Sequence, residues 1–317
     1  MFSFFKKKKD TPAPAWASFF SAEEYRRFVL AVEDYFKSNN IEATVHDGIV
    51  EGAEAFGGGQ LGLSNLAQMC RGMEPGLWAQ QIAGHFETMR RNVQTQKEFE
   101  TRSADFEYAK DFIGVRLFNT EVLQRDTDSF FIRRPLLKDV FSMLCFDLPD
   151  SVINVKPEQA AKWPDKTEDE LFALGMENIR QKYPLQLAHE RIGESLMWVT
   201  AGEHFFMPNI LFDLDRHPQL NSPHGMLIGV PTRHVALIYP INDLSVVGAV
   251  TTMTQVIRGM YQEGPGSLSG SLYWYRNGQF EDQPFDTAGG KVQFRPTGNF
   301  TDMMNTLQAP QGEMSNG

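Results

Sequence analysis

The sequence predicts an α+β protein, with a helix-rich N-terminal lobe and a C-terminal lobe of antiparallel strands packed by helices. Apolar residues recur at helical spacing through much of the chain before residue 93, which is typical of amphipathic helices. The strongest strand patterns, residues 225–230 and 234–239, flank a short turn and therefore predict an antiparallel hairpin. A length of 317 residues with 42% apolar residues predicts about two domains with a buried core.

The first predicted helix runs from residue 22 to about residue 38. Ser21 and Glu24 have the spacing of a capping box, in which two side chains satisfy the free N–H groups at a helix start. Apolar residues then fall on one face of the helix. Two short strands and two further helices are predicted in residues 41–51, 63–73 and 75–92.

The middle of the chain combines strands with two helices. Strands are predicted at residues 112–118, 130–134, 140–148 and 151–155. Helices are predicted at residues 157–163 and 167–182. The second helix begins with another capping-box pattern, formed by Thr167 and Glu170.

Strand patterns dominate after Pro184. They are predicted at residues 185–188, 195–200, 225–230, 234–239 and 272–275. Helices are predicted at residues 208–215 and 244–261. The chain is expected to fray from Thr301 onward.

The composition divides the chain into four segments. Charged residues and prolines at positions 156–166 indicate a boundary between two lobes. We expect a disordered basic tail, two α+β lobes and a second disordered tail, at residues 1–17, 18–160, 161–300 and 301–317.

Charge and cysteine content exclude several classes of protein. Apart from Lys6 to Lys9, the chain carries 26 basic and 40 acidic residues, a formal charge of −14, which disfavours nucleic acid as a partner. Cys70 and Cys145 lie in apolar surroundings without zinc-site spacing, so a reducing compartment, the cytoplasm, is expected. The longest apolar stretch, residues 226–241, is interrupted and too short to cross a membrane.

The first nine residues have two interpretations. Aromatic residues stand next to four lysines, and together they could touch an anionic membrane surface, with each lysine contributing about 1 kcal/mol. The residues concerned are Phe2, Phe4, Phe5, Lys6, Lys7, Lys8 and Lys9. The favoured interpretation is a solvated, disordered tail, because the segment is short.

Two motifs resemble cofactor or metal sites only superficially. Residues 57–62 match the glycine spacing of a dinucleotide-binding loop, but no buried strand precedes them and two carboxylates stand nearby, so no cofactor is expected. Histidines and carboxylates gather in residues 204–224. Asp213 and Asp215 point in different directions on a helix, and no His-x-x-x-His pair occurs, so no metal is expected.

Arg233 and His234 interrupt the apolar hairpin. The guanidinium could hold a carboxylate or phosphate through two parallel hydrogen bonds, and the imidazole could titrate near neutral pH. A solvated charged turn is the alternative that we favour. Glu177 and Asn178 on the predicted helix at residues 167–182 are further ligand-binding candidates, with an ordinary surface position as the alternative.

Short motifs from residue 131 onward follow one another in a familiar order. They are Arg134-Pro135-Leu136-Leu137, Leu144-Cys145-Phe146-Asp147, Trp163 ahead of Glu170-Leu171, Gly175-Met176-Glu177-Asn178-Ile179, Asn209-Ile210-Leu211 and Gly229-Val230-Pro231-Thr232-Arg233. Over residues 130–260 the chain resembles the YtpQ-like family of bacterial proteins, a domain of unknown function. An Asp usually follows the turn arginine in that family, whereas His234 stands here. The resemblance implies a bacterial cytosolic α+β protein and transfers no catalytic residue.

Three functions are therefore considered. The lack of a nucleophile motif or paired carboxylates favours a non-catalytic interaction or adaptor module with an unknown protein partner. Its predicted partner surface is the aromatic segment Tyr273-Trp274-Tyr275, for which core packing is the alternative. The second is a ligand-binding protein or enzyme that uses Arg233, His234 and the region of Asp213 and Asp215. The third is a peripheral membrane protein held by residues 1–9.

Overall fold

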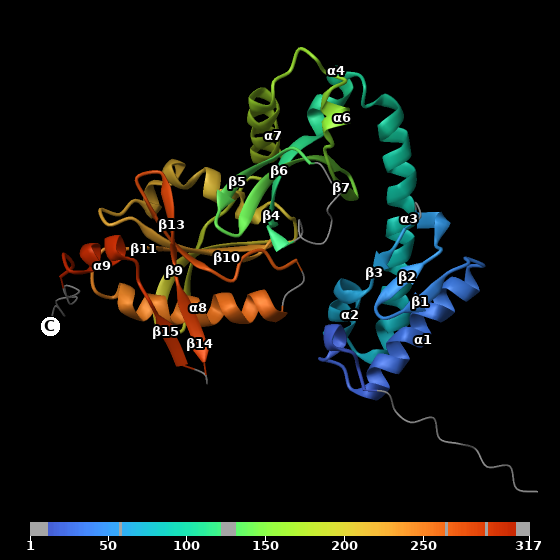
Figure 1. Cartoon of the computed structure of the whole chain (residues 1–317), viewed down its shortest axis with the longest axis horizontal. Coiled ribbons are helices and arrows are strands. Elements are labelled where there is room, and N and C mark those ends of the chain that lie inside the picture. Colours follow the sequence, from blue (N-terminus) through green and yellow to red (C-terminus); the bar gives the residue numbers. More distant parts are fainter. Residues whose placement is uncertain (1–11, 57–58, 122–130, 264–265, 289–290, 309–317) are drawn as a thin grey trace, which may run out of the picture. The chain divides into compact units, whose positions relative to one another are not determined.

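The computed structural model describes residues 12–56, 59–121, 131–263, 266–288 and 291–308 (Figure 1). It is an α+β protein with several antiparallel sheets and a helix-rich N-terminal region, which confirms the predicted class. The chain divides into two compact units. The N-terminal unit is Met1–Arg102 with Leu148–Ser151, and the C-terminal unit is Ser103–Asp147 with Val152–Gly317.

The N-terminal unit combines three helices with a small antiparallel sheet in the order β1-β2-β3. Its elements are α1 (Ala22–Ser38), β1 (Thr44–His46), β2 (Ile49–Glu51), β3 (Leu61–Gly62), α2 (Ser64–Arg71) and α3 (Trp78–Arg102), with 3₁₀ turns at Ala15–Ala17, Glu54–Phe56 and Pro75–Leu77. Helix α1 begins as predicted, because the Ser21 hydroxyl accepts from the Glu24 N–H and the Glu24 carboxylate accepts from the Ser21 N–H. Aromatic rings fill the core, where Tyr35 stacks on Phe86 with ring centroids 5.0 Å apart.

The C-terminal unit contains two larger sheets. One has the order β4-β6-β5, with β7 also paired to β6, and the other has the order β13-β12-β10-β11-β9-β8. The strands are β4 (Ile113–Asn119), β5 (Arg133–Leu137), β6 (Val140–Leu148), β7 (Ser151–Asn154), β8 (Ala188–Ile192), β9 (Ser195–Ala201), β10 (Met226–Thr232), β11 (Val235–Pro240), β12 (Leu272–Arg276), β13 (Gln279–Gln283), β14 (Phe285–Ala288) and β15 (Lys291–Phe294). Strands β14 and β15 pair as a separate ribbon.

The helices of this unit lie between and after these strands. They are α4 (Phe106–Ala109), α6 (Pro157–Ala160), α7 (Glu168–Lys182), α8 (Val246–Glu263) and α9 (Gly298–Met304). Short 3₁₀ segments occur at Lys110–Phe112, Met207–Phe212, Leu214–Arg216 and Pro218–Leu220.

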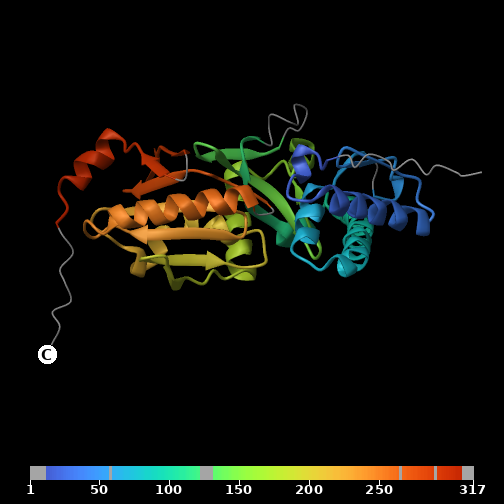
Figure 2. The ribbon, with the colours of Figure 1, turned by 90° about the horizontal axis from the view of Figure 1, so that it is seen from below.

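The six-stranded sheet is buried on both faces at its central strand β10. Residues that alternate along β10 point to opposite faces, so Leu227 packs with α8 and α9 while Ile228 packs with the 3₁₀ segments and the other large sheet. Figure 2 shows α8, in orange, lying against the strands of this sheet. The continuous hydrophobic run predicted for β10 therefore reflects burial on both sides.

Helix α7 covers the β4–β6 sheet through a pair of glycines. A Cβ atom added at Gly175 would lie 2.9 Å from the backbone carbon of Gly114, so the helix backbone packs directly on the strand. The helix begins at the predicted capping box, in which the Thr167 hydroxyl accepts from the N–H of Glu170. This close packing fixes the position of the last turn of α7, which carries Arg180.

The structure differs from the sequence predictions at several elements. The chain divides after Arg102, with Leu148–Ser151 also in the first unit, whereas the composition predicts a boundary near residue 160. Helix α3 continues ten residues beyond its predicted end. The strand predicted at residues 185–188 is placed too early in the chain. Leu185 and Leu187 pack into the core, and β8 begins at Ala188. The helix predicted at residues 208–215 consists of two 3₁₀ segments.

Regular structure extends into both segments that the sequence predicts as tails. Residues 15–17 already form a 3₁₀ turn, in which Ala17 is fully buried. At the other end, α9 extends to Met304, and Met303 is only 4% exposed. The prediction that the chain frays from Thr301 is therefore wrong for the first turn beyond that residue.

Candidate functional site

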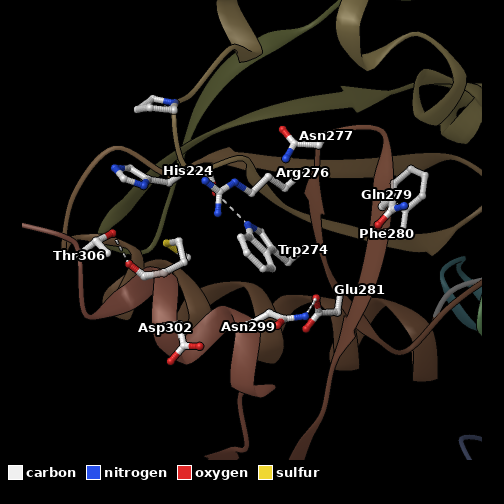
Figure 3. Close-up of a pocket in the computed structure, with 12 residues that line it drawn as sticks. His224, Trp274, Arg276, Asn277, Gln279, Phe280, Glu281, Asn299, Asp302 and Thr306 are labelled. Atoms are coloured by element: carbon white, nitrogen blue, oxygen red, sulfur yellow. Dashed lines mark hydrogen bonds between the residues drawn. The ribbon is translucent and has the colours of Figure 1, made fainter.

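An open cleft of about 830 Å³ lies in the C-terminal unit, between the β12–β13 hairpin and α9 (Figure 3). Most of its lining side chains are polar. The lining residues are Pro223, His224, Trp274, Arg276, Asn277, Gln279, Phe280, Glu281, Asn299, Asp302, Met303 and Thr306. A cleft of this size is within the range of small-molecule and peptide sites.

The hairpin provides the floor of the cleft. The strand register pairs Trp274 with Glu281 and Arg276 with Gln279, and paired residues share one face of a sheet. The two strands are joined by Asn277 and Gly278, whose φ angles of 51° and 78° form the left-handed turn that Asn-Gly favours. The tight turn therefore brings four side chains of different chemistry to one surface.

The indole of Trp274 fixes the neighbouring loop. Its Nε1–H donates to the carbonyl oxygen of His224 at 2.9 Å, and its ring packs edge-on against Phe300 of α9. Gly225 follows with φ of +78°, and any Cβ there would collide with the carbonyl oxygen of Tyr275. The loop and the helix are thus both anchored on the same tryptophan.

Helix α9 forms the opposite wall. The Thr297 hydroxyl accepts from the Phe300 N–H at the helix start and donates to the Glu281 carboxylate. The second oxygen of that carboxylate accepts from Asn299 Nδ2 at 3.1 Å. Glu281 is therefore engaged in positioning the helix.

Two charged side chains of the cleft form neither an ion pair nor a hydrogen bond among the described residues. Arg276 and Asp302 are exposed, and within the described residues neither has an oppositely charged group within 4.0 Å. Figure 3 shows Arg276 on the hairpin side and Asp302 on the α9 side of the cleft. The Arg276 guanidinium lies 5.7 Å from the Trp274 ring centroid, a contact that does not neutralise its charge. Among the described residues, the cleft thus offers an unpaired cation, an unpaired anion and several amide groups to a ligand.

The structure separates Asp213 and Asp215, which the sequence predicts as ligand-binding candidates. Asp213 is buried and forms an ion pair with Arg180 of α7, with Nη2 2.8 Å from Oδ1. Asp215 accepts from the Tyr275 hydroxyl at 3.1 Å. Their contacts are those of residues that hold secondary-structure elements together.

Glu177 and Asn178 have structural contacts as well. Glu177 accepts from Gln181 on its own helix and lies 3.6 Å from Arg180. The Asn178 amide donates to the carbonyl oxygens of Lys110 and Ile113, at 2.7 and 2.8 Å. The amide thereby joins α7 to the chain segment that leads into β4.

Arg233 and His234 are brought together with His204, which lies thirty residues earlier in the chain. The Arg233 guanidinium lies 4.1 Å from the ring centroid of Phe205, and its Nε donates to His234 Nε2 at 3.3 Å. Burial lowers the pKa of His204 and of His234, and repulsion between the two rings lowers the pKa of His204 further. The positive charge of Arg233 also lowers the pKa of His234. Both histidines therefore favour the neutral ring more strongly than a solvent-exposed histidine does.

The predicted aromatic partner surface is buried. Tyr273, Trp274 and Tyr275 are 1%, 4% and 8% exposed, so the expectation of an exposed segment is wrong. Strand β12 is covered on both faces, and the Tyr273 hydroxyl donates to Asp139 in the turn between β5 and β6. Only Trp274 reaches the cleft, as part of its floor.

Some of the predicted site residues lie outside the part of the chain that the structure describes. The membrane-surface candidates in residues 1–9 lie outside the residues that the structure describes, as do Gly57 and Gly58 of the glycine motif. Within the described ranges, no three His, Cys, Asp or Glu side chains are grouped as metal ligands, and no helix is long and apolar enough to cross a membrane.

The cleft was missed by sequence reasoning, although one signal points to it. Arg276-Asn277-Gly278-Gln279 contains the Asn-Gly pair that marks a two-residue hairpin directly after the predicted strand at residues 272–275. Comparison of the chain with protein-family models, characterised proteins and solved structures finds no match, so the likeness to the YtpQ-like family stays a prediction.

Proposed function

We propose that this protein is a non-catalytic binding module that holds an extended peptide segment of a partner protein in the cleft between the β12–β13 hairpin and α9. The observation that carries the proposal is the pair of uncommitted opposite charges, Arg276 and Asp302, on the two sides of an open polar cleft of about 830 Å³. A peptide with one acidic and one basic side chain fits that arrangement.

The other lining residues support a peptide. Asn277, Gln279 and Asn299 provide amide groups that can donate to and accept from peptide backbone. Strand β13 is the last strand in the order of its sheet, so one row of its backbone groups has no strand partner in that sheet. Extended peptides bind such edges by adding a strand, and side-chain pockets then provide specificity.

The same residues give little support to catalysis. Glu281 is held by Thr297 and Asn299, and the indole N–H of Trp274 is used by the His224 carbonyl. Asp302 and the His224 imidazole are free to exchange a proton, but among the described residues neither has a hydrogen-bond partner that would orient it, as an acid–base catalyst needs. Binding and orientation are therefore the functions that this lining favours.

A reducing compartment is part of the proposal. Cys70 and Cys145 are free and buried, and burial raises their pKa values to about 11 and about 12. Thiols that stay protonated are slow to oxidise or exchange, which fits a packing role in the cytoplasm.

A selection experiment with charge reversal tests the proposal. A random peptide library displayed on phage is panned against the full chain, and the affinity of the selected peptides is measured by calorimetry. We expect peptides that carry both charge signs. Arg276→Glu is expected to weaken binding by about tenfold, and exchanging the acidic peptide residue for lysine should restore it.

Two controls make the test specific. Arg191→Glu changes the charge of an exposed residue on β8, at the other end of the same sheet, and should leave the affinity unchanged. Asp302→Lys should weaken binding as well, and exchanging the basic peptide residue for an acidic one should restore the affinity. Selected peptides that bind all variants equally, or a panning that yields no peptide, would contradict the proposal.

A further inference from the structure

A smaller, partly enclosed cavity of about 120 Å³ lies elsewhere in the C-terminal unit, between α7 and the 3₁₀ segments that follow β9. For comparison, a cavity of about 150 Å³ holds one benzene molecule. A ligand of this cavity is therefore no larger than a single six-membered ring. None of its lining residues lines the peptide cleft, so the two sites are separate.

The last turns of α7 provide an apolar wall. Met176, Ile179 and Tyr183 are three and four residues apart, which places them on one face of the helix. The Tyr183 hydroxyl donates to the Asp147 carboxylate at 2.9 Å, so this residue presents its ring to the cavity and not a free hydroxyl. Leu185, from the chain after the helix, extends the same wall. This side of the cavity can contact only the apolar part of a ligand.

The two charged residues of the lining neutralise each other. Asp213 accepts from Nη2 and Nε of Arg180 at 2.8 and 2.9 Å, and Arg216 Nε lies 3.4 Å from the same carboxylate. A charged ligand would therefore enter without a free counter-ion, and burial of an unpaired charge is costly. The imidazole of His217 also lines the cavity and can donate or accept a hydrogen bond. The lining thus favours a neutral ligand.

The amide of Asn209 has an unsatisfied oxygen. Asn209 lines the cavity and is 2% exposed, and its Nδ2 donates to the Val115 carbonyl oxygen of β4 at 2.8 Å. Its Oδ1 is closed off from bulk solvent and has no hydrogen-bond partner among the described residues. The opposite amide orientation would place two acceptor oxygens against each other, so Oδ1 is the free atom. A buried acceptor without a donor costs free energy unless a ligand or an ordered water supplies one.

We propose that this cavity binds a small neutral molecule that carries an O–H or N–H donor on a compact apolar body, with the donor bound to Asn209 Oδ1. The apolar wall favours such a ligand over water alone, because a buried water needs about two to four polar partners and Met176, Ile179 and Leu185 provide none. The proposal does not rest on the function of the peptide cleft.

Two pairs of probes test the donor with the full chain. Phenol and fluorobenzene have nearly the same shape, but only phenol has an O–H group. 2-Piperidone and cyclohexanone differ in the same way, by an N–H group. Titrations followed by saturation-transfer NMR measure the affinity of each probe. We expect phenol or 2-piperidone to bind about tenfold more tightly than its donor-free partner, because one hydrogen bond to a buried acceptor is gained. The pair that shows the difference distinguishes a hydroxyl ligand from an amide ligand.

Three variants locate the binding. Leu185→Phe enlarges a side chain of the cavity wall and should weaken binding of the probes by about tenfold or more. Leu187→Phe is the matched control, because Leu187 packs against the same core without lining the cavity, and it should bind as the wild type does. Asn209→Leu removes the acceptor at similar volume, so the donor-free probe should still bind while the preference for the donor-bearing one is lost.

Unfolding temperatures of the variants show whether each has folded. Asn209→Leu also removes the hydrogen bond to Val115, so the comparison of Leu185→Phe with Leu187→Phe remains decisive if that variant does not fold. The proposal is overturned if neither donor-bearing probe binds the wild type more tightly than its partner, or if Leu185→Phe and Leu187→Phe bind equally. A donor preference that persists in folded Asn209→Leu would overturn it as well.

Discussion

Arg180 and Asp213 face each other with two parallel contacts, Nη2 to Oδ1 at 2.8 Å and Nε to Oδ2 at 2.9 Å. Arg180 belongs to α7, and Asp213 follows the 3₁₀ segment Met207–Phe212. Asp213 is 7% exposed, so the ion pair is shielded from solvent on the carboxylate side. This pair joins the helix that covers one sheet to the segment that packs on the other.

Asp213→Ala should destabilise the protein by about 2 kcal/mol, because the half-buried guanidinium of Arg180 would lose its two short contacts and keep only the Glu177 carboxylate at 3.6 Å. Asp215→Ala is the matched control. It removes a carboxylate two residues away that accepts a single hydrogen bond, from Tyr275, and should cost about 1 kcal/mol. Urea unfolding of both variants measures the difference, and equal losses would contradict a special role for the Arg180 pair.

Gly175→Ala tests the backbone contact between α7 and β4. The added methyl group would lie 2.9 to 3.2 Å from backbone atoms of Gly114, which cannot move aside as a side chain can. We expect a loss of about 2 kcal/mol in unfolding free energy. Gly259→Ala in α8 is the control, because nothing lies within 4 Å of its added Cβ and alanine favours the helix by up to about 1 kcal/mol.

Local patterns in the sequence predicted the elements that depend on local interactions. Helices α1 and α7 begin where Ser21 with Glu24, and Thr167 with Glu170, provide both halves of a capping box. Strand β13 was missed because Gln279, Glu281 and Asp282 give it a polar pattern, although the Asn277-Gly278 turn before it is a hairpin signal.

Contacts between distant segments could not be predicted from the sequence. Gly114 and Gly175 are sixty-one residues apart, and nothing in the chain indicates that one glycine makes room for the other. Arg116 lies within a strand that was predicted correctly, yet the shielding of its Nε atom, which has no hydrogen-bond partner among the described residues, depends on how β4 packs in the folded unit. The sequence therefore identified Arg233 and His234 but could not supply their neighbours.

The two histidines predict how stability changes with pH. Burial lowers the pKa values of His204 and His234 in the folded protein, so an unfolded chain with ordinary values near 6.5 binds protons more readily. The free energy of unfolding should therefore fall as the pH drops from about 7.5 through about 6.5 toward the folded pKa values.

Replacing both histidines isolates their contribution. The double variant His204→Gln, His234→Gln should show a shallower fall in unfolding free energy between pH of about 7.5 and about 5.5. His85 in the N-terminal unit also has a pKa lowered by burial. His85→Gln therefore serves as the comparison, because it replaces a buried histidine of the other unit. An unchanged slope in the double variant would show that the two rings are protonated equally in both states.

Trp274→Phe tests whether the indole N–H organises the cleft. The phenylalanine ring keeps the apolar contact with Phe300 but loses the hydrogen bond to the His224 carbonyl, which leaves a half-buried acceptor without its donor. We expect a loss of about 1 kcal/mol in unfolding free energy and weaker binding of the selected peptides, because the loop at residues 223–224 would no longer be held. Trp198→Phe is the control, since Trp198 stacks on His189 at the β8 edge of the sheet and does not line the cleft. If peptide affinity is the same in both variants, the loop does not contribute to binding, and the free charges of Arg276 and Asp302 alone must account for it.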